Sequence, residues 1–335
     1  MPAKIVVFES APVIAESFKR LTRDHAVVFE NDLLSARNVA AHADARIISI
    51  DQSILNSEII HGFDALELIA VRSTGFDHID TDACKQKRIL ISNVPGYAAN
   101  AVAEHTFALL LAISRHIQAA TGFTRRTRFC WDGLQGVELQ GKTLAVIGTG
   151  AIGKRVAEIA RGFSMVVKAF DLRPDHAWAG GHAVEYLTFE EAIAVADIIS
   201  LNIPASRDKA HLLGRAEFDH MKQGVVILNT ARGELIDNQA LVNALADGTV
   251  SAAGLDVLPD EHFIREKEKD PSIFFQKAFD PDTMLANTLL CQHPRVIVTP
   301  HIGWYSFEAA QRSYDVSVDN IEAFLAGHPA NRVCP

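Results

Sequence analysis

The sequence has no hydrophobic run long enough to cross a bilayer. Its longest apolar stretch of this kind, 107–113, falls far short of the roughly 18 residues that a membrane helix needs. The apolar stretch near the N-terminus is also too short for the core of a secretory signal and is typical of a first β-strand. We therefore expect a cytoplasmic protein with no membrane partner.

Cysteine is scarce, and runs of basic residues are missing. The four cysteines are scattered, with neither a CxxC pair nor a paired histidine spacing, so we expect free thiols rather than a disulfide framework, and no metal site. They are Cys84, Cys130, Cys291 and Cys334. The formal net charge is −9. A surface of this sign repels a phosphate backbone on average, which argues against nucleic acid as a partner.

The pattern that is present is alternation of short apolar strands with helical segments. Most of the strand candidates are apolar throughout, as in parallel sheets covered on both faces, so the expected fold class is α/β. A length of 335 residues exceeds a typical single domain of about 100–200 and favours two domains. The expected strands are 4–8, 46–50, 68–72, 143–148, 166–171, 197–201, 225–229, 251–255 and 296–299.

Three segments interrupt this rhythm. A long helical stretch at about 98–120, followed by an irregular segment at 121–140, is a candidate crossover between the two domains. The tail 304–327 has helical apolar spacing, lacks strands of its own and is expected to pack back onto the first domain. The region 260–290 shows no strand signal, and long insertions of this kind are often functional loops.

A glycine-rich loop follows the strand at 143–148. Gly148, Gly150 and Gly153 form a GxGxxG pattern with Ala151 and Ile152 inside it, between a strand and a helix. The first glycine allows a tight turn, the second a close approach to a pyrophosphate and the third close helix–strand packing. This context predicts a dinucleotide-binding site.

An acidic residue completes this fingerprint. Asp171 ends the next strand, 21 positions after Gly150, where a carboxylate accepts hydrogen bonds from ribose hydroxyls and repels a 2′-phosphate. We therefore expect NAD rather than NADP, although Arg173 nearby offers a phosphate partner.

Polar segments also follow three later strands, at the edge where ligands bind in open α/β sheets. They are 229–237 (NTARGELID), 254–257 (GLDV) with Glu261 shortly after, and 299–303 (TPHIG). With these and the segments 71–80 (VRSTGFDHID), 93–106 (NVPGYAANAVAEHT) and 146–153 (VIGTGAIG), the chain resembles the D-isomer-specific 2-hydroxyacid dehydrogenases. Arg232 and Glu261 are 29 positions apart, the spacing that this family shows.

The resemblance implies two Rossmann-like or flavodoxin-like domains with parallel sheets and a catalytic cleft between them. Residues 1–100 with 302–335 would form the substrate-binding domain, and residues 101–301 the NAD-binding domain. It further implies cofactor contacts from Ile203 and Pro204, from Thr230, Ala231 and Arg232, and from Asp256 on the nicotinamide side. The family's small polar residue after Pro204 is replaced at about that place by Lys209, so that contact is not carried over.

The residue types fit reduction of a 2-keto acid to a 2-hydroxy acid. Hydride transfer leaves negative charge on the carbonyl oxygen, and His301 is a suitable proton donor near neutral pH. Glu261 would favour and orient the imidazolium, and Arg232 offers a planar fork for the substrate carboxylate. The resemblance adds the backbone N–H groups of Ser73, Thr74 and Gly75 on the other side of that carboxylate.

Aromatic residues bear on the choice of substrate. Tyr97 matches an aromatic position of the lactate and branched 2-hydroxyacid branch, and Trp304 and Tyr305 follow His301 closely. If they line the pocket, an apolar or aromatic substrate side chain is favoured over a phosphorylated one. Core packing explains them equally well. Lactate, hydroxyisocaproate, phenyllactate and glycerate all remain open.

Two alternatives share the architecture. Formate dehydrogenases fit less well, because that branch lacks the catalytic glutamate. An NAD-sensing scaffold resembling the C-terminal-binding-protein corepressors would keep Arg232, Glu261 and His301 and show little turnover. A homodimer is expected, because family members commonly pair through the region of the long helix.

Overall fold

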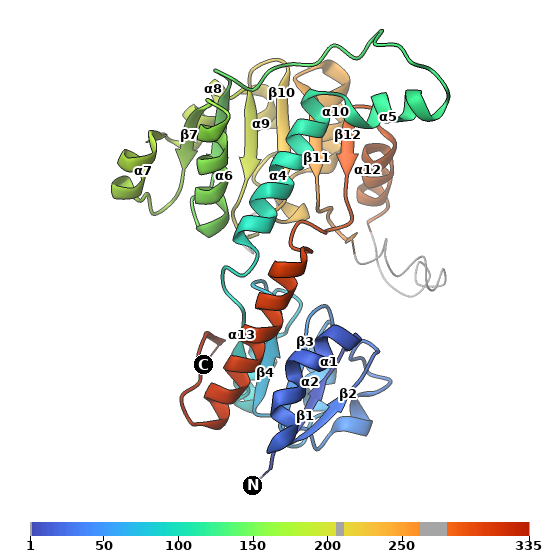
Figure 1. Cartoon of the computed structure of the whole chain (residues 1–335), viewed down its shortest axis with the longest axis vertical. Coiled ribbons are helices and arrows are strands. Elements are labelled where there is room, and N and C mark those ends of the chain that lie inside the picture. Colours follow the sequence, from blue (N-terminus) through green and yellow to red (C-terminus); the bar gives the residue numbers. More distant parts are fainter. Residues whose placement is uncertain (1, 206–210, 262–279, 335) are drawn as a thin grey trace. The chain divides into compact units, whose positions relative to one another are not determined.

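The computed structural model describes residues 2–205, 211–261 and 280–334, and the chain divides into two compact units (Figure 1). Unit 1 comprises Met1–Ala98 and Tyr305–Pro335, and unit 2 comprises Ala99–Trp304. The divisions fall at 98/99 and 304/305, where the sequence suggested 100/101 and 301/302. Each unit is built on its own largely parallel sheet, which confirms the expected α/β class with two parallel-sheet domains.

The sheet of unit 1 has the order β13-β5-β4-β3-β1-β2. Its strands are β1 (Lys4–Val7), β2 (Ala26–Phe29), β3 (Ile47–Ile50), β4 (Leu68–Val71), β5 (Leu90–Ser92) and β13 (Arg332–Cys334). All neighbouring strands run parallel except β13, which pairs antiparallel with β5. The central strands β3 and β4 are buried along their whole length, which explains why their sequences are almost entirely apolar.

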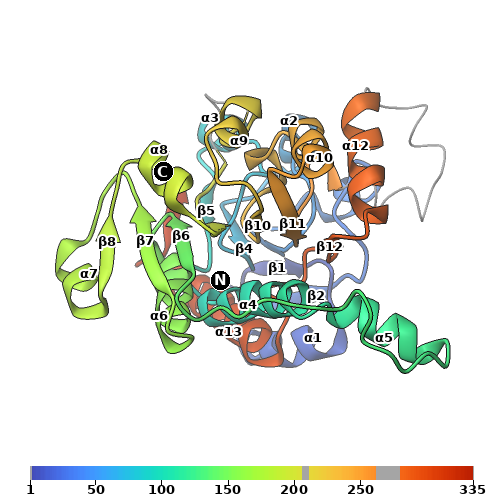
Figure 2. The same ribbon diagram turned by 90° about the horizontal axis from the view of Figure 1, so that it is seen from above.

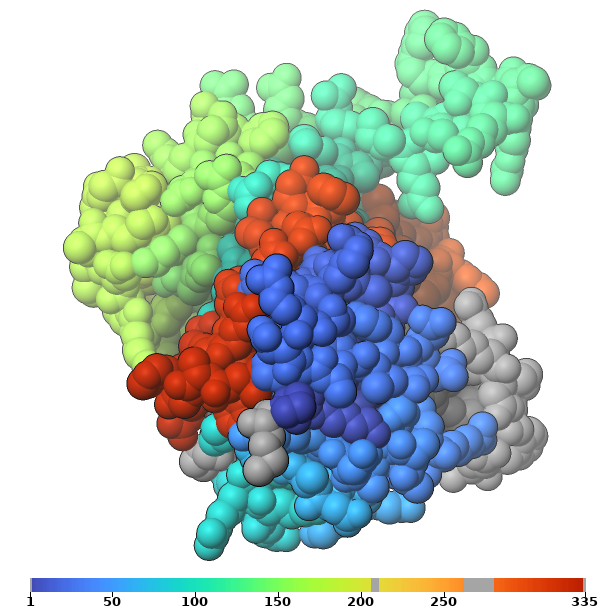
Figure 3. Space-filling view, turned by 60° about the horizontal axis from the view of Figure 1, so that its bottom comes forward, coloured from blue at the N-terminus to red at the C-terminus, as the bar shows by residue number. Residues whose placement is uncertain are grey.

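Helices cover both faces of this sheet. They are α1 (Pro12–Phe18), α2 (Ser57–His61), α3 (Thr81–Lys87) and α13 (Phe307–Leu325), with the 3-10 turns η1 (Lys19–Arg23) and η2 (Val39–His42). Helix α13 packs against α1 and β4, and the C-terminal segment lies beside the N-terminal one in Figure 3. The tail therefore returns to the first unit, as the sequence indicated.

The sheet of unit 2 is parallel, with the order β12-β11-β10-β9-β6-β7-β8. The strands are β6 (Thr143–Ile147), β7 (Val166–Phe170), β8 (Val184–Tyr186), β9 (Ile198–Leu201), β10 (Val225–Asn229), β11 (Val250–Leu255) and β12 (Val296–Val298). The chain starts at β6 and proceeds to one side and then to the other, so the strand order reverses between β6 and β9. Ligands bind at the carboxyl edge of such a reversal point.

Two layers of helices enclose this sheet. Figure 2 shows α4 (Ala99–Ser114) and α6 (Ala151–Gly162) on one face and α8 (Phe189–Val195), α9 (Arg215–Asp219) and α10 (Asn238–Asp247) on the other. The remaining helical elements are α5 (Ile117–Arg125), α7 (His176–His182), α12 (Pro281–Gln292) and the 3-10 turn η3 (Gly233–Leu235). None of the helices in the described ranges has the length and apolar character that a membrane span requires.

The structure corrects several sequence expectations. The helix expected at 98–120 is two helices, because His116 adopts a left-handed backbone (φ 50°) and its Nε2 bonds to the carbonyl oxygen of Gln135 at 3.1 Å. The tail 304–327 is helical, as expected, and the short strand β13 that follows it was not predicted. Helix α12 begins within the region 260–290 and ends at Gln292, and its start carries signals that could have been used, an Asp280 N-cap followed by Pro281.

Candidate active site

The residues expected to bind the dinucleotide lie at one edge of unit 2. Gly148, Asp171, Thr230 and Asp256 each directly follow the end of a strand of the parallel sheet, and Thr299, which was not among the expected residues, does the same. Because parallel strands end at the same edge, residues scattered over more than 150 positions of the sequence come together there.

The glycine loop is shaped by close backbone contacts. Gly148 has a φ of +93°, and a side chain there would also collide with the carbonyl oxygen of Asn202 at 2.6 Å. A Cβ on Gly153 would lie 1.8 Å from the carbonyl oxygen of Gly148, so helix α6 packs directly on the turn. Nothing lies within 4 Å of the corresponding position on Gly150. The loop therefore leaves one open face, next to Gly150.

This open face fits a pyrophosphate. Helix α6 starts at Ala151, and no side chain caps its first turn, so the N–H groups of Ala151, Ile152 and Gly153 are available at the positive end of the helix. Ile203, whose Cγ2 lies 2.5 Å from the position that a Cβ on Gly148 would take, borders the turn, and Pro204 is the next residue of the chain. The residues present thus fit a dinucleotide.

Asp171 is tied to the same loop. One carboxylate oxygen accepts hydrogen bonds from the Thr149 N–H at 2.6 Å and its hydroxyl at 3.0 Å, and the other accepts from the Arg173 N–H at 2.8 Å. Partial burial raises the pKa of Asp171, but the N–H groups of Arg173 and Thr149 outweigh it and hold the pKa below its usual range. The group is therefore negatively charged at neutral pH, which disfavours a 2′-phosphate nearby.

Arg232 stands on a loop that is braced by Asn229. The Asn229 side chain accepts from the Ala231 N–H at 3.1 Å and donates to the Arg232 carbonyl at 2.8 Å. A Cβ on Gly233 would lie 2.1 Å from the backbone of Leu258, so the loops after β10 and β11 pack tightly together. Because Glu261 follows Leu258 by three residues, this packing brings the loops of Arg232 and Glu261 side by side.

His301 and Glu261 form a direct pair. The Nδ1 atom of His301 lies 2.5 Å from Oε1 of Glu261, and both side chains are about one-third exposed. Nδ1–H donating to a carboxylate fixes the tautomer and leaves Nε2 as the nitrogen that exchanges a proton. The pair therefore has the composition of an oriented acid–base group at the carboxyl edge of the sheet.

Asp256 holds the turn that carries His301. Its carboxylate accepts from the N–H groups of Ile302 at 2.9 Å and Gly303 at 2.7 Å, and its carbonyl accepts from the His301 N–H at 2.8 Å. His301 itself has a φ of +57°, a left-handed conformation that a residue with a side chain rarely adopts. The bonds to Asp256 maintain this conformation.

Two further residues, which the sequence analysis did not single out, complete this network. The hydroxyl of Thr299 lies 2.5 Å from Asp256 Oδ1 and 3.0 Å from Nε2 of His105, and His105 Nε2 is 3.3 Å from the same Oδ1. Burial raises the pKa of Asp256, but the bonds from His105, Thr299 and the two N–H groups lower it below its usual range. His105 lies in the motif AEHT and Thr299 in the motif TPHIG. These two motifs were the sequence signal by which the residues could have been found.

Thr230 is linked to helix α4 rather than exposed. It is 8 % accessible, and its hydroxyl lies 2.9 Å from the hydroxyl of Thr106. Lys209, at which the family's contact was not carried over, and residues 262–279 of the region 260–290 lie outside the described residues.

In unit 1, the expected carboxylate-binding loop offers its N–H groups. The carbonyl oxygens of Ser73, Thr74 and Gly75 accept from Val94 N–H, Asn93 Nδ2 and Ser73 Oγ, respectively. Among the described residues, no acceptor pairs with the three N–H groups of this loop. An anion is the natural partner for such a group of donors.

The three aromatic candidates differ in exposure. Tyr97 is buried, and its carbonyl oxygen accepts from Arg312 Nε at 2.9 Å within unit 1. Tyr305 is 68 % exposed, and Trp304 is intermediate and ends unit 2.

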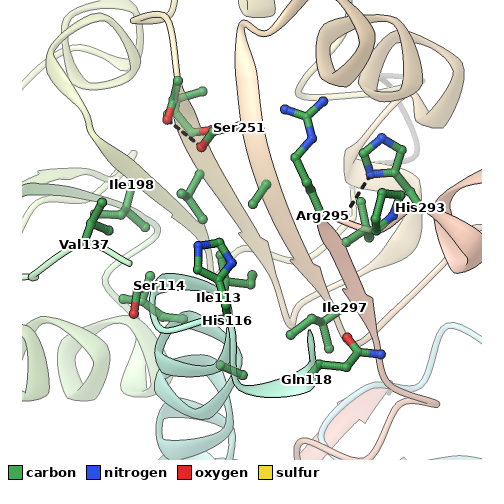
Figure 4. A pocket seen from close by; sticks show the side chains of 18 of the residues that line it. Ile113, Ser114, His116, Gln118, Val137, Ile198, Ser251, His293, Arg295 and Ile297 are labelled. Atoms are coloured by element: carbon green, nitrogen blue, oxygen red, sulfur yellow. Dashed lines mark hydrogen bonds between the residues drawn. The ribbon is translucent and has the colours of Figure 1, made fainter. Parts of the chain in front are cut away.

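A cavity of about 670 Å³ lies at the opposite edge of the unit 2 sheet. Ser114 and His116 come from the end of α4 and the residue before α5, Ser251 from the start of β11 and Ile297 from the middle of β12 (Figure 4). Lys142 and Asp197, which also line the cavity, directly precede β6 and β9. The cavity is therefore separate from the candidate residues of unit 2 that lie at the carboxyl edge of the sheet.

A Rossmann-type sheet, an open glycine loop with its acidic partner, and a histidine–carboxylate pair at the same edge define a dinucleotide-dependent oxidoreductase. Residues 107–303 match the domain described as "D-isomer specific 2-hydroxyacid dehydrogenase, NAD binding domain". The chain belongs to this family. It is an NAD-dependent 2-hydroxyacid dehydrogenase, as the resemblance implied.

Named relatives cover most of the chain. It is 35 % identical to a glycerate dehydrogenase of Methylorubrum extorquens over 86 % of this chain and 85 % of that protein. It is 36 % identical to an aromatic 2-oxoacid reductase of Clostridium sporogenes, over 80 % and 79 %. The structure of a D-lactate dehydrogenase from Aquifex aeolicus, complexed with NAD and lactic acid, matches with a TM-score of 0.88, 30 % identity and 99 % coverage of both chains.

Proposed function

We propose that the chain reduces a 2-keto acid to the D-2-hydroxy acid, with His301 as the proton donor. The observation that carries this proposal is the 2.5 Å contact between His301 Nδ1 and Glu261 Oε1 on a turn that Asp256 holds in place. Bound NADH supplies the hydride for the keto carbon. His301 Nε2 then donates a proton to the carbonyl oxygen, and in the reverse direction it removes that proton.

Glu261 and Arg232 have separate roles in this proposal. Glu261 fixes the histidine ring and stabilises the positive charge that the ring carries before it donates its proton. Arg232 binds the substrate carboxylate and polarises the carbonyl, because its guanidinium presents several donors in one plane. The bracing of its loop by Asn229 supports this role, since a positioned fork loses less entropy on binding.

The cofactor is held by residues of unit 2. The N–H groups at Gly150–Gly153 bind the pyrophosphate, and Asp171 binds the adenosine ribose. Ile203, Pro204, Thr230, Ala231 and Asp256 are the remaining proposed neighbours of the cofactor. For Asp256 the buried carboxylate supports a positioning role for the His301 turn as well.

The substrate carboxylate is also bound by the N–H groups of Ser73, Thr74 and Gly75. Each carbonyl oxygen of this loop already accepts a hydrogen bond within unit 1, which supports this assignment. For the substrate side chain, Tyr97, Trp304 and Tyr305 favour an apolar or aromatic group, and the similarity to an aromatic 2-oxoacid reductase points the same way. The similarity to a glycerate dehydrogenase keeps hydroxypyruvate among the candidates.

The experiment that tests this function is NADH oxidation with a panel of 2-keto acids. Pyruvate, glyoxylate, hydroxypyruvate, 2-ketoisocaproate, phenylpyruvate and oxaloacetate are compared, each also with NADPH, and the product's configuration is determined by chiral chromatography. We expect rapid turnover of one or two acids, giving the D product with NADH. Tight NADH binding without turnover of any acid would contradict the proposal and favour a scaffold function.

We further propose that the chain is a homodimer that assembles through unit 2. Residues 115–136, here called the protruding segment, leave the body of unit 2 beside the cavity (Figures 1 and 3), and their base is closed by the bond from Val137 N–H to the Ser114 carbonyl at 2.9 Å. Phe129 is 95 % and Trp131 83 % exposed on this segment. Two large aromatic side chains so exposed support contact with a second copy.

The proposed compartment is the cytoplasm. In the described part of the chain, Cys84, Cys130 and Cys291 form no disulfide, which fits a compartment where thiols are kept reduced.

A further inference from the structure

The most deeply buried charged side chain of unit 1 lies next to the carboxylate-binding loop. Arg72, directly before Ser73, has a side chain that is only 1 % exposed. Its guanidinium donates to the carbonyl oxygen of Phe8 at 2.8 Å and to Ser49 Oγ at 3.0 Å, and it pairs with Glu9 at 3.3 Å. The planar guanidinium of Arg72 thus connects the carboxyl ends of β1, β3 and β4.

Glu9 is itself held by a second loop. Its carboxylate accepts from the N–H groups of Asp51 at 2.7 Å, Gln52 at 2.9 Å and Ser53 at 2.8 Å, and from the Ser53 hydroxyl. Glu9 also has a left-handed backbone, with a φ of +54°. Its carboxylate therefore joins the turn after β3 to the arginine after β4.

The main chain at Arg72 is fixed on both sides. Its N–H donates to the carbonyl of Ile50 at 2.8 Å, and its carbonyl oxygen accepts from the hydroxyl of Ser313, a buried residue of α13. The next three residues are Ser73, Thr74 and Gly75, whose N–H groups face no acceptor among the described residues. Any rotation of the peptide after Arg72 would redirect these donors.

A buried ion pair of this kind contributes little net free energy to folding. Desolvation of two charges offsets most of their attraction, and apolar residues of the same volume commonly serve as well. Arg72 Nε even lacks an acceptor within the described part of the chain. What the pair supplies and apolar residues do not is a defined geometry at the entrance to the loop.

We propose that Glu9 and Arg72 are a positioning pair that aims the N–H groups of Ser73–Gly75 at the substrate carboxylate, with Ser313 as the third anchor. This inference rests on the proposed function, because it assigns the loop to the carboxylate. Glu9 and Arg72 do not touch the substrate; they act through the backbone of the loop.

Three variants and one control test the pair. Arg72→Lys keeps the positive charge but cannot make all the hydrogen bonds of the guanidinium. Glu9→Gln removes the negative charge. Ser313→Ala removes the hydrogen bond to the Arg72 carbonyl and leaves both charges in place. Arg46→Lys is the matched control, because Arg46 forms an exposed ion pair with Glu67 at the other end of the same sheet. For each protein, KM and kcat for the best 2-keto acid, the Kd of NADH, and amide hydrogen exchange at residues 72 and 94 are measured. These two amides report on the order of the loop, because Arg72 N–H donates to the Ile50 carbonyl and Val94 N–H to the Ser73 carbonyl.

We expect KM for the keto acid to rise about tenfold or more in the three variants, with a smaller change in kcat, because the loop binds the carboxylate in both the ground and the transition state. NADH affinity and the control should remain as in the wild type, and exchange at residues 72 and 94 should accelerate. Unchanged KM in a folded variant would overturn the proposal. So would parallel loss of keto acid and NADH binding, since that indicates general destabilisation.

The exchange measurement separates this proposal from the proposed function. If the wild type reduced no acid in the panel, the assigned activity would fail, and exchange at residues 72 and 94 would still decide whether the pair orders the loop. Variants that exchange there at the wild-type rate would overturn the positioning role whatever the activity.

Discussion

At the scale of single residues, His301 is the centre of the proposed chemistry. It is held by Glu261 through Nδ1 and by Asp256 through its backbone, which leaves Nε2 without a partner among the described residues. Asp171 has a comparable position for the cofactor, because its charge is stabilised by the N–H groups around it. Each residue therefore yields a prediction that one substitution can test.

His301→Ala should lower kcat/KM for keto-acid reduction by about 10²–10⁴-fold, because the proton donor is lost. NADH binding, measured by fluorescence titration, should remain, since the glycine loop is unaffected. His328→Ala, an exposed histidine of unit 1, serves as the control. Loss of NADH binding in a folded His301→Ala protein would show that the site has been placed wrongly.

Asp171→Ala should reduce the preference for NADH over NADPH, measured as the ratio of their kcat/KM values. We expect a drop of about tenfold, which corresponds to about 1.4 kcal/mol, because the negative charge no longer repels a 2′-phosphate. Asp171→Asn separates the loss of the charge from the loss of the hydrogen-bond acceptor, since it removes the charge and keeps an acceptor for Thr149. An unchanged ratio in both variants would remove Asp171 from the ribose contact.

At the scale of elements, the positions of the strands follow from local composition, whereas the shapes of the turns after them depend on long-range contacts. All residues of the strands β3, β4 and β9 are buried, so their sequences are almost entirely apolar, and this composition allowed them to be predicted. The edge strand β2, with exposed ends, and the three-residue strands β5 and β8 were missed because too few side chains carry the pattern. The shape of the turn after β12 could not be predicted locally, because it is determined by Asp256, which follows a different strand, β11.

The turn held by Asp256 should make stability depend on pH in the acid range. Because the folded pKa of Asp256 lies below its ordinary value of about 3.9, its contribution is fully present above that pH and is lost as the pH falls through the folded pKa. The difference in unfolding free energy between the wild type and Asp256→Asn should therefore shrink below about pH 4. Urea titrations at several pH values measure it.

The exposed Asp219→Asn is the control for this series. A wild-type advantage over Asp256→Asn that stayed constant down to pH 3, to within about the error of the extrapolation, would contradict a lowered pKa for Asp256.

At the scale of the whole molecule, the two units each bring part of the proposed chemistry. Unit 2 contains the NAD-binding residues and the His301–Glu261 pair, and unit 1 contains the loop Ser73–Gly75. The protruding segment of unit 2 exposes its aromatic residues Phe129 and Trp131.

Replacing Phe129 and Trp131 together by alanine should weaken the dimer, because the most exposed apolar area of the protruding segment is removed. Light scattering coupled to size-exclusion chromatography at micromolar concentration should report a lower mass than for the wild type. Leu172→Ala is the matched control, since Leu172 is 88 % exposed elsewhere on unit 2. A wild type that elutes as a monomer would contradict the proposed assembly.

The sequence by itself determined the α/β class, the glycine loop, Asp171 and the family. These features depend on neighbouring residues, because strand composition, GxGxxG spacing and motif order are all local. Only the tertiary structure decided that Asp256 holds the His301 turn with His105 and Thr299, and that Glu9 pairs with Arg72. Such partners are dozens to nearly two hundred positions apart, and packing of separate strands and helices, rather than any repeated spacing, brings their polar atoms within hydrogen-bonding distance.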